Sequence, residues 1–382
     1  GMVALADSFA DHTLVVPEGD LAEATAVRPG AVRGVPNLRV LVDVLGGRRG
    51  WPVPAGPIGP SPVRPPGPDL ADVRGQRVGR RAVEVAAAGG HHILLVGPPG
   101  SGKTMLAERL PGLLPRLGRE AAVEVSRVHS AAGLALPEGG LLLDPPWRAP
   151  HHGASAVSLV GGGTVAMRPG EISLAHHGVL FLDEMGEFPT AVLDALRQPL
   201  EEGVVRVSRA RGTVTLPARF ILVGAMNPCP CGNGGPPGSC RCTPAARARY
   251  ARRLSGPLLD RFDLVVSLAR PEPGELLSTV PAEPTAAVAG RVAAARRAAG
   301  RRGVSCNALL PMVDLDRLAP LTAEAATLLD RQVRIGQLSG RGLHRIRRVA
   351  RTIADLHGAG GSSVGAAHVA EALALRAGPI VG

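Results

Sequence analysis

A run rich in glycine and proline, ending in lysine and threonine, directly follows a short apolar stretch at 93–96. The run comprises Gly97, Pro98, Pro99, Gly100, Ser101, Gly102, Lys103 and Thr104. Between a strand and a helix, such a run forms a cradle whose backbone N–H groups face the phosphates of a nucleotide. Lys103 would bring a positive charge to the β- and γ-phosphates, and the Thr104 hydroxyl would bind Mg²⁺. The sequence therefore predicts that ATP and Mg²⁺ bind here.

Two carboxylates, Asp183 and Glu184, end the apolar stretch 179–182. At the carboxyl end of a strand beside the phosphate cradle, Asp183 would hold Mg²⁺ through water. Glu184 would polarise the water that attacks the γ-phosphate. Asn227 ends the next apolar stretch and could orient the same water, although asparagine at a strand end is also common turn chemistry. These positions predict ATP hydrolysis, with Glu184 and Asn227 as catalytic residues.

Four of the five cysteines form two Cys-X-Cys pairs: Cys229, Cys231, Cys240 and Cys242. Cysteines clustered in this way in a cytosolic protein indicate Zn²⁺ held by four thiolates. Such a metal would be structural, because four thiolates leave no open position for water. The spacing within each pair is tighter than in most zinc sites, so a redox or unligated loop is the alternative.

The chain divides into segments of different composition. Residues 1–45 are predicted to form a small α/β piece, and the stretch 46–68, rich in glycine and proline, is predicted to be a linker. From 69 to 270, apolar strands alternate with helical patterns, which predicts an α/β fold with a parallel sheet covered by helices. Strands are expected at 93–96, 179–182 and 220–223, and helices at 77–88, 105–110 and 189–201. Residues 271–382 are predicted to form a helical lid.

The chain carries a formal net charge of +11, and almost all of its positively charged side chains are arginines. This charge favours a polyanionic partner such as DNA, although an arginine bias also follows from a GC-rich genome. Aromatic residues make up only 2% of the chain, so any grip on DNA is expected to be electrostatic and salt-sensitive. No apolar run approaches the ~18–20 residues of a membrane span, and the amino terminus lacks the apolar segment of a signal peptide. We therefore expect a cytoplasmic protein without membrane contact.

Further motifs carry a resemblance to a known family. They lie at 168–178 (RPGEISLAHHG), 227–232 (NPCPCG), 258–263 (LLDRFD) and 348–356 (RVARTIADL). Together with the phosphate loop and the Asp-Glu strand, they resemble the AAA+ ATPases, and among these the magnesium-chelatase-like ComM (YifB) family. The resemblance implies an AAA+ parallel sheet core at 69–270 with β-hairpin and helix-2 insertions, followed by a helical lid at 271–382. Residues 1–45 resemble only the tail of that family's amino-terminal Lon-protease-like (S5-like) domain.

The resemblance also implies roles for arginines. Arg261 would be the arginine finger, which reaches from one subunit into the ATP site of its neighbour. Arg341 matches the lid arginine that senses the γ-phosphate, with Arg345 as the alternative. Spacing cannot choose among the arginines of this basic helix, and a solvent-exposed basic face is the other interpretation. A finger that acts between subunits implies a homo-oligomeric ring, and the family implies a hexamer.

The stretch 204–216 alternates apolar and polar residues, which predicts a β-hairpin with Arg211 and Gly212 at its turn. In helicase-like AAA+ proteins such hairpins point into the pore of the ring. The resemblance would therefore set Arg209 and Arg211 against the phosphate backbone of DNA. The alternative is an ordinary surface hairpin.

Together, the motifs favour a ring-forming ATPase motor that moves along DNA. By its resemblance to the ComM family, it would promote branch migration when transforming DNA recombines. A magnesium-chelatase motor subunit, which drives metal insertion into a porphyrin, would use the same ATPase core, but the paired cysteines and the Lon-like remnant argue against it. A nucleotide-switched assembly scaffold is a third hypothesis. The presence of Glu184 disfavours it, because a scaffold has no need to activate water.

Overall fold

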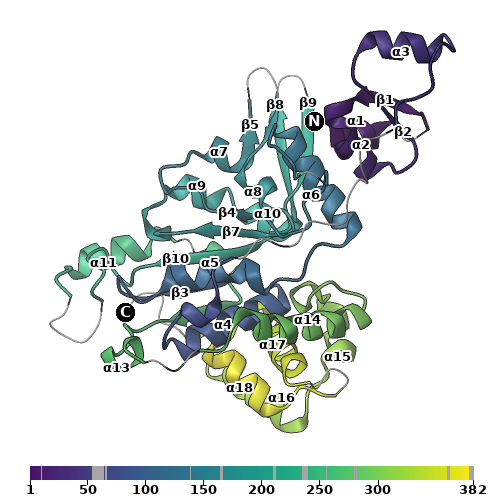
Figure 1. Cartoon of the computed structure of the whole chain (residues 1–382). Helices are drawn as coiled ribbons and strands as arrows, with labels where there is room; N and C mark the ends of the chain where they lie inside the picture. Colours follow the sequence, from purple (N-terminus) through teal and green to yellow (C-terminus); the bar gives the residue numbers. More distant parts are fainter. Residues whose placement is uncertain are drawn as a thin grey trace.

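The structure is a computed structural model of the chain. It describes residues 1–9, 11–53, 64, 67–137, 139–163, 167–209, 212–234, 240–254, 256–278, 280, 282–358 and 362–377. A small amino-terminal unit lies beside an α/β core, and a helical region lies on the opposite side of that core (Figure 1).

The core is built on a five-stranded parallel sheet of order β11-β3-β10-β7-β4. In chain order the strands are β3 (Ile93–Val96), β4 (Trp147–Arg148), β7 (Val179–Leu182), β10 (Ile221–Met226) and β11 (Leu264–Ser267). The predicted α/β fold with a parallel sheet is confirmed. The short edge strand β4 was not predicted, because its two residues leave no periodic pattern in the sequence.

Both faces of the sheet are covered. Ile93 and Leu95 face one hydrophobic core, whereas Leu94 and Val96 face a second, as the two-residue period of a strand requires. The first core includes residues of helices α4 (Arg77–Gly89), α5 (Lys103–Leu113), α14 (Thr285–Arg301) and α17 (Gly340–Leu356). The second includes residues of α8 (Glu171–Leu174) and α9 (Thr190–Asp194), and Leu200 of α10 (Arg197–Glu202) packs against it. Burial on both faces explains why these strands are continuous apolar runs.

The single helix predicted at 189–201 is wrong, because this segment forms two short helices, α9 and α10. Pro199 accounts for the break. A continuous helix would need a donor at position 199 for the carbonyl of Ala195, and proline has none. The backbone N–H of Leu200 then donates to Leu196 at 3.0 Å, which starts the second helix.

The amino-terminal unit is attached to the core by polar contacts. It contains α1 (Met2–Ser8), β1 (Leu14–Pro17), η1 (Glu18–Asp20), α2 (Leu21–Val27), β2 (Val32–Val35) and α3 (Leu38–Leu45), with β1 and β2 parallel. Asp7 forms an ion pair with Arg127 of α6 (Arg119–Ala131) at 2.6 Å, and Arg119 donates to the carbonyl of Ala26 at 2.9 Å. Most of the expected linker at 46–68 lies outside the described residues, but Arg64 pairs with Asp144 of the core at 3.3 Å.

A β-hairpin projects from the core beside the amino-terminal unit (Figure 1). It pairs β8 (Val204–Arg209) with β9 (Gly212–Pro217) in antiparallel fashion, which confirms the predicted hairpin. Val205 and Val207 anchor it in the second core, while much of β9 is exposed. Arg211 and the side chain of Arg209 lie outside the described residues. A second small ribbon, β5 (Gly161–Gly162) with β6 (Arg168–Pro169), follows α7 (Ala156–Val160).

The carboxyl-terminal region is helical, as predicted. Besides α14 and α17 it contains η4 (Asn307–Leu309), η5 (Met312–Asp314), α15 (Leu315–Leu318), α16 (Ala323–Arg334) and α18 (Ala366–Ala374). The remaining short helices of the chain are η2 (Leu70–Asp72), η3 (Met185–Glu187), α11 (Pro244–Ala251), α12 (Gly256–Leu259) and α13 (Pro273–Leu276). Among the described residues, no helix is both long enough and apolar enough to cross a membrane.

A buried polar network joins this helical region to the sheet. His91, two residues before β3, is fully buried, and its ring nitrogens lie 3.2 Å from a carboxylate oxygen of Asp263 and 2.8 Å from the hydroxyl of Thr352 of α17. Burial by itself would raise the pKa of Asp263, but the hydrogen bond with His91 and the nearby charges of His92 and Arg345 lower it to about 2. The carboxylate therefore stays ionised and keeps α17 docked at this end of the sheet.

A second buried histidine, His176, should make the fold acid-sensitive. Its side chain is 2% exposed, its Nδ1 accepts from the backbone N–H of Arg219, and its Nε2 lies 3.0 Å from a carboxylate oxygen of Glu124. Burial, followed by the charge of His177, lowers the pKa of His176 from 6.5 to about 4. The fold thus favours the neutral imidazole. The contribution of neutral His176 to the free energy of unfolding is fully present above pH 6.5. As the pH falls from 6.5 to 4, about 3 kcal/mol of this contribution is progressively lost.

Urea unfolding at pH 7.5 and pH 4.5 tests this expectation. The free energy of unfolding should decrease as the pH is lowered, and His176→Gln should reduce this decrease by about 2–3 kcal/mol, because glutamine keeps hydrogen-bonding capacity but does not titrate. A decrease should remain in the variant, since burial also lowers the pKa of His92 to about 4. An equal pH dependence in the two proteins would assign the acid sensitivity to other groups.

Candidate functional site

The loop after β3 encloses the Lys103 side chain. Gly100 and Gly102 have φ angles of +79° and +80°, left-handed conformations that favour glycine, and α5 begins immediately after them. The Lys103 ammonium donates to the carbonyl of Gly97 at 2.7 Å and to that of Pro98 at 3.0 Å. It also donates to Oδ1 of Asn227 at 3.2 Å. Burial lowers the pKa of Lys103, and the charges of Asp183 and Glu184 oppose that shift.

The oxygen atoms expected to hold Mg²⁺ lie side by side. The Thr104 hydroxyl donates to Oδ2 of Asp183 at 2.9 Å, and Oδ1 of Asp183 accepts from the backbone N–H of Glu184 at 2.8 Å. Hydroxyl and carboxylate oxygens are the ligands that Mg²⁺ prefers, so this pair fits the ion. The two groups come from the ends of β7 and α5, which the sheet order brings together.

Glu184 has an unusual backbone and a partner that the sequence did not indicate. Its φ of +49° is left-handed, which is uncommon for a residue with a side chain and is often found at functional sites. Its carboxylate is largely exposed and lies 3.3 Å from Nδ1 of His152. His152 follows β4, the neighbour of β7, so recognising it from the sequence would have required that strand to be identified first.

The order of the strands explains why the predicted residues converge. Asn227 follows β10, which lies between β3 and β7, so its amide stands between the phosphate loop and the acidic pair. The structure thus brings Lys103, Thr104, Asp183, Glu184 and Asn227 to the carboxyl edge of the sheet.

A cavity of about 360 Å³ adjoins the start of α5. It was not apparent from the sequence, because its walls come from segments before α4 and after β11. The described residues that line it are Asp72, Val73, Arg74, Gln76, Gly100, Gly102, Lys103, Thr104, Met105, Pro271 and Leu276. Gln76, at a φ of +50°, donates to the carbonyl of Ala269 at 2.6 Å and closes one side. The mixture of apolar and polar walls suits a nucleoside next to the phosphates.

Arg261 lies at the opposite end of the strands, their amino ends, three residues before β11. We call this side of the sheet its amino edge. Its guanidinium pairs with Glu201 at 2.6 Å, and its side chain is 15% exposed. β11 runs parallel to β3, so the length of a four-residue strand, about 10 Å or more, separates Arg261 from the phosphate loop of the same chain. The predicted finger therefore does not join the cluster around Lys103.

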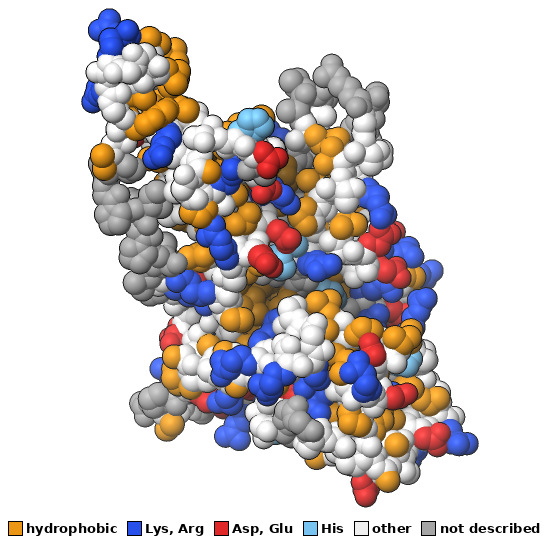
Figure 2. Space-filling view, turned by 90° about the vertical axis from the view of Figure 1, so that its right-hand side faces the viewer, with side chains coloured by type: hydrophobic (Ala, Val, Ile, Leu, Met, Phe, Trp, Pro, Cys, Tyr) orange, Lys and Arg blue, Asp and Glu red, His pale blue; other side chains and the backbone are white. Residues whose placement is uncertain are grey.

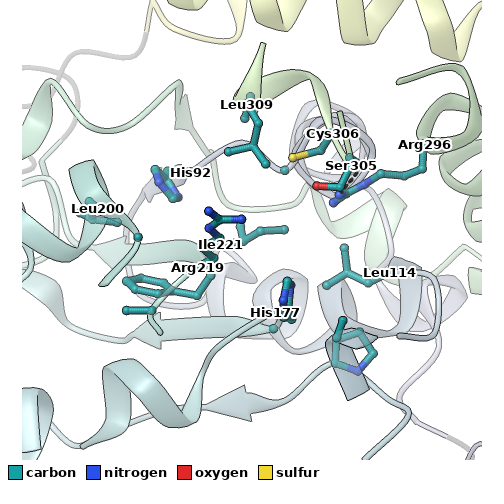
Figure 3. A pocket seen from close by; sticks show the side chains of 18 of the residues that line it. His92, Leu114, His177, Leu200, Arg219, Ile221, Arg296, Ser305, Cys306 and Leu309 are labelled. Carbon is teal, nitrogen blue, oxygen red and sulfur yellow. Dashed lines mark hydrogen bonds between the residues drawn. The ribbon is translucent and has the colours of Figure 1, made fainter. Parts of the chain in front are cut away.

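A larger cavity of about 730 Å³ opens at this amino edge, where the surface is hollowed between the core and the helical region (Figure 2). Its arginines are Arg116, Arg219, Arg261, Arg296, Arg345 and Arg348. Figure 3 shows His92, His177 and Arg219 from the core opposite Arg296 and Cys306 of the helical region. Arg341 is exposed in the first turn of α17, and Arg345, the alternative, lines this cavity with Arg261. The described residues around the phosphate-loop cavity include none from α17.

The four paired cysteines form a compact group at the carboxyl edge. The sulfur of Cys229 lies 3.3 Å from that of Cys231 and 3.6 Å from that of Cys240, and all four sulfurs lie within 4.8 Å of one another. Sulfurs of a tetrahedral Zn²⁺ site stand about 3.8 Å apart, given zinc–sulfur bonds of ~2.3 Å, so the group fits this ion. Backbone N–H groups of Asn233 and Arg241 lower the pKa of Cys231 to about 6, whereas burial raises the pKa of Cys229 to about 12, so a metal would have to displace the proton of the buried thiol.

Lys103 offers a direct test of nucleotide binding, because it is the only lysine of the chain. Pyridoxal 5′-phosphate followed by borohydride should label Lys103 and the terminal amine, since its phosphate fits the same loop as a nucleotide. Mg²⁺-ATP at about ten times its dissociation constant should reduce labelling of Lys103 about tenfold. Peptide mass spectrometry measures the labelling, with the terminal amine as internal control. Undiminished labelling at saturating Mg²⁺-ATP would contradict nucleotide binding at this loop.

Comparison with known proteins agrees with this geometry. A family model described as magnesium chelatase, subunit ChlI, matches residues 69–276, and one for the ChlI C-terminal part matches residues 282–376. An uncharacterised protein of Mycobacterium tuberculosis is 47% identical over 368 residues, which cover 95% of this chain and 72% of that protein. YifB of Escherichia coli is 47% identical over 314 residues, which cover 81% of this chain and 60% of YifB. Competence protein ComM of Haemophilus influenzae is 41% identical over 377 residues, or 98% of this chain and 73% of ComM.

These matches confirm the resemblance stated from the motifs. The five-stranded parallel sheet and the helical carboxyl-terminal region also agree with the AAA+ fold. The chain belongs to the magnesium chelatase ChlI-like family of AAA+ proteins, together with YifB and ComM.

Proposed function

We propose that this protein is an ATP-hydrolysing AAA+ ring motor that acts on DNA and, like ComM, promotes branch migration during recombination of transforming DNA. The observation that carries the ATPase part is the meeting of Lys103, the Thr104–Asp183 pair, Glu184 and Asn227 at one edge of the sheet. Membership of the same family as a protein named for competence supports the DNA part.

Each residue at the carboxyl edge has a distinct part in the proposed hydrolysis. Lys103 exchanges its hydrogen bonds to the carbonyls of Gly97 and Pro98 for bonds to the β- and γ-phosphate oxygens, while Asn227 keeps the ammonium between the loop and the acidic pair. Thr104 and Asp183 would hold Mg²⁺, which would neutralise charge on the phosphates. Glu184 orients the attacking water and accepts its proton, and His152 holds that carboxylate in place at 3.3 Å. The nucleoside occupies the cavity beside Gln76.

The separation of Arg261 from Lys103 supports assembly into a ring. An arginine at the amino edge can complete an ATP site only on another copy of the chain, whose carboxyl edge faces it. Arg345 lines the same cavity and would approach the neighbour's nucleotide together with Arg261. A head-to-tail contact of this kind closes into a ring, for which the family resemblance suggests six subunits. Hydrolysis then depends on assembly.

Mixing two inactive variants tests the ring. Glu184→Gln should bind ATP and assemble but hydrolyse at least about a hundredfold more slowly, because it lacks the base for water. Arg261→Ala should also be inactive, since its neighbours receive no finger. In a one-to-one mixture, about one quarter of interfaces pair an intact Glu184 with an intact Arg261, so about that share of turnover should return. A mixture that is no more active than its components, or an Arg261→Ala protein that hydrolyses ATP, would contradict the role of Arg261 as an arginine finger.

The action on DNA rests on charge and on the projecting hairpin. The net charge of +11 favours a polyanion, and the β8–β9 hairpin, with Arg209 at the end of β8, projects from the core (Figure 1). In a ring, hairpins of this kind would line the central opening. A scarcity of aromatic side chains favours contacts to phosphates over stacking on bases.

ATP hydrolysis measured with and without four-way-junction DNA tests this action. Junction DNA should stimulate turnover, and raising the salt from about 50 to 200 mM should remove most of the stimulation, because phosphate contacts release counterions. Replacing Arg209 and Arg211 by alanine should lower the stimulation but leave basal turnover unchanged, while Glu184→Gln serves as the inactive control. Healthy turnover that DNA does not alter would point instead to the alternative hypothesis, a motor subunit that drives metal insertion into a porphyrin.

A further inference from the structure

The segment that carries the paired cysteines begins inside the ATP site. Asn227 accepts a hydrogen bond from Lys103, and Cys229, two residues later, is 1% exposed and belongs to the sulfur group. The position of the Asn227 amide is therefore tied to the position of the first sulfur. A displacement of Cys229 would move the group that holds the only lysine.

The same segment supports the phosphate loop directly. Gly232, next to Cys231, is packed so closely against the ring of Pro99 that an added Cβ would lie 2.9 Å from its Cγ and Cδ atoms. Gly232 also has a φ of +78°, which favours glycine. This turn between the cysteine pairs thus serves as one wall of the loop that holds the phosphates.

The carboxyl-terminal end of the cysteine segment contacts the backbone that follows Asp183 and Glu184. Cys242 leads into α11, where Tyr250 is buried against Gly186 and its hydroxyl is hydrogen-bonded to the backbone of Asn227. Arg253 donates to the carbonyl of Gly186 at 2.6 Å and pairs with Glu187 at 2.9 Å. Gly186 follows Glu184 by two residues, so both ends of the cysteine segment reach the catalytic elements.

We propose that the four cysteines bind one Zn²⁺ and that this ion controls nucleotide affinity, by fixing the segment that positions Asn227 and supports Pro99. Sulfurs 3.3 to 3.6 Å apart are ready to converge on one cation, and without it no disulfide joins Cys229 or Cys231 to Cys240. Loss of zinc then releases the wall of the phosphate loop while the sheet stays folded. The inference rests on the proposed function in that ATP must bind at Lys103.

Zinc content and nucleotide binding, measured on the same full-length chain, test this inference. Elemental analysis should find about one zinc per chain. A fluorescent ATP analogue with Mg²⁺ should bind about tenfold or more weakly after treatment with a zinc-selective chelator, and Zn²⁺ alone should restore the affinity. Circular dichroism of the stripped protein should be nearly unchanged, because the helices and the sheet do not depend on the ion.

Two substitutions separate zinc binding from its effect. Gly232→Ala keeps all four thiolates and so should keep its zinc, but its methyl group meets Pro99 and should weaken nucleotide binding. Cys306→Ser is the matched control, because Cys306 lies outside the sulfur group and should keep both zinc and affinity. A Gly232→Ala protein that loses nucleotide affinity but not zinc would support the coupling.

The outcomes distinguish the two proposals. A chain that holds no zinc after purification and reconstitution, or one whose nucleotide affinity is the same with and without zinc, overturns the inference and leaves the ATPase intact. A zinc-loaded chain that fails to bind the nucleotide analogue overturns the proposed ATPase function itself.

Discussion

The arrangement of the candidate ATP site depends on the three hydrogen bonds that the buried ammonium of Lys103 donates. A charged group that leaves water costs several kcal/mol unless its donors are satisfied. Lys103 meets this condition through two carbonyls of its own loop and the amide of Asn227. The arrangement requires β3 and β10 to be neighbours, with Val96 in register with Met226. An ammonium donates three protons in a pyramidal arrangement, to three oxygens around one nitrogen, whereas a guanidinium donates only in its plane. This difference explains why position 103 is a lysine although every other Lys or Arg position of the chain is arginine.

The parallel sheet gives the molecule two chemically different edges. Carboxylates, an amide and thiols follow the carboxyl ends of its strands, whereas arginines and buried histidines precede the amino ends. His91 and Asp263 also attach α17 at the amino edge, so the helical region contributes to that side. The direction of the strands therefore separates the residues that bind a nucleotide, at the carboxyl edge, from the arginines that could complete the ATP site of a neighbouring subunit, at the amino edge.

The elements with strong local signals could be predicted from the sequence. The phosphate loop, Asp183, Glu184 and Asn227 each follow a continuous apolar strand, and the sheet then brings them together. Features that depend on distant segments could not be predicted: the pairing of His152 with Glu184 depends on a two-residue strand, and the cavity beside Gln76 has walls from both ends of the core. Spacing alone also could not choose between Arg341 and Arg345, because the choice depends on how α17 docks.

The packing of α11 has a consequence for spectroscopy. Tyr250 is the only tyrosine of the chain, and it lies between Gly186 and the backbone of Asn227. Burial, followed by the charge of Glu187, raises the pKa of its phenol to about 12. Ultraviolet absorbance of phenolate in alkaline solution thus comes from a single position next to the acidic pair. The protein carries an intrinsic, label-free reporter of the contact between its cysteine segment and its catalytic strand.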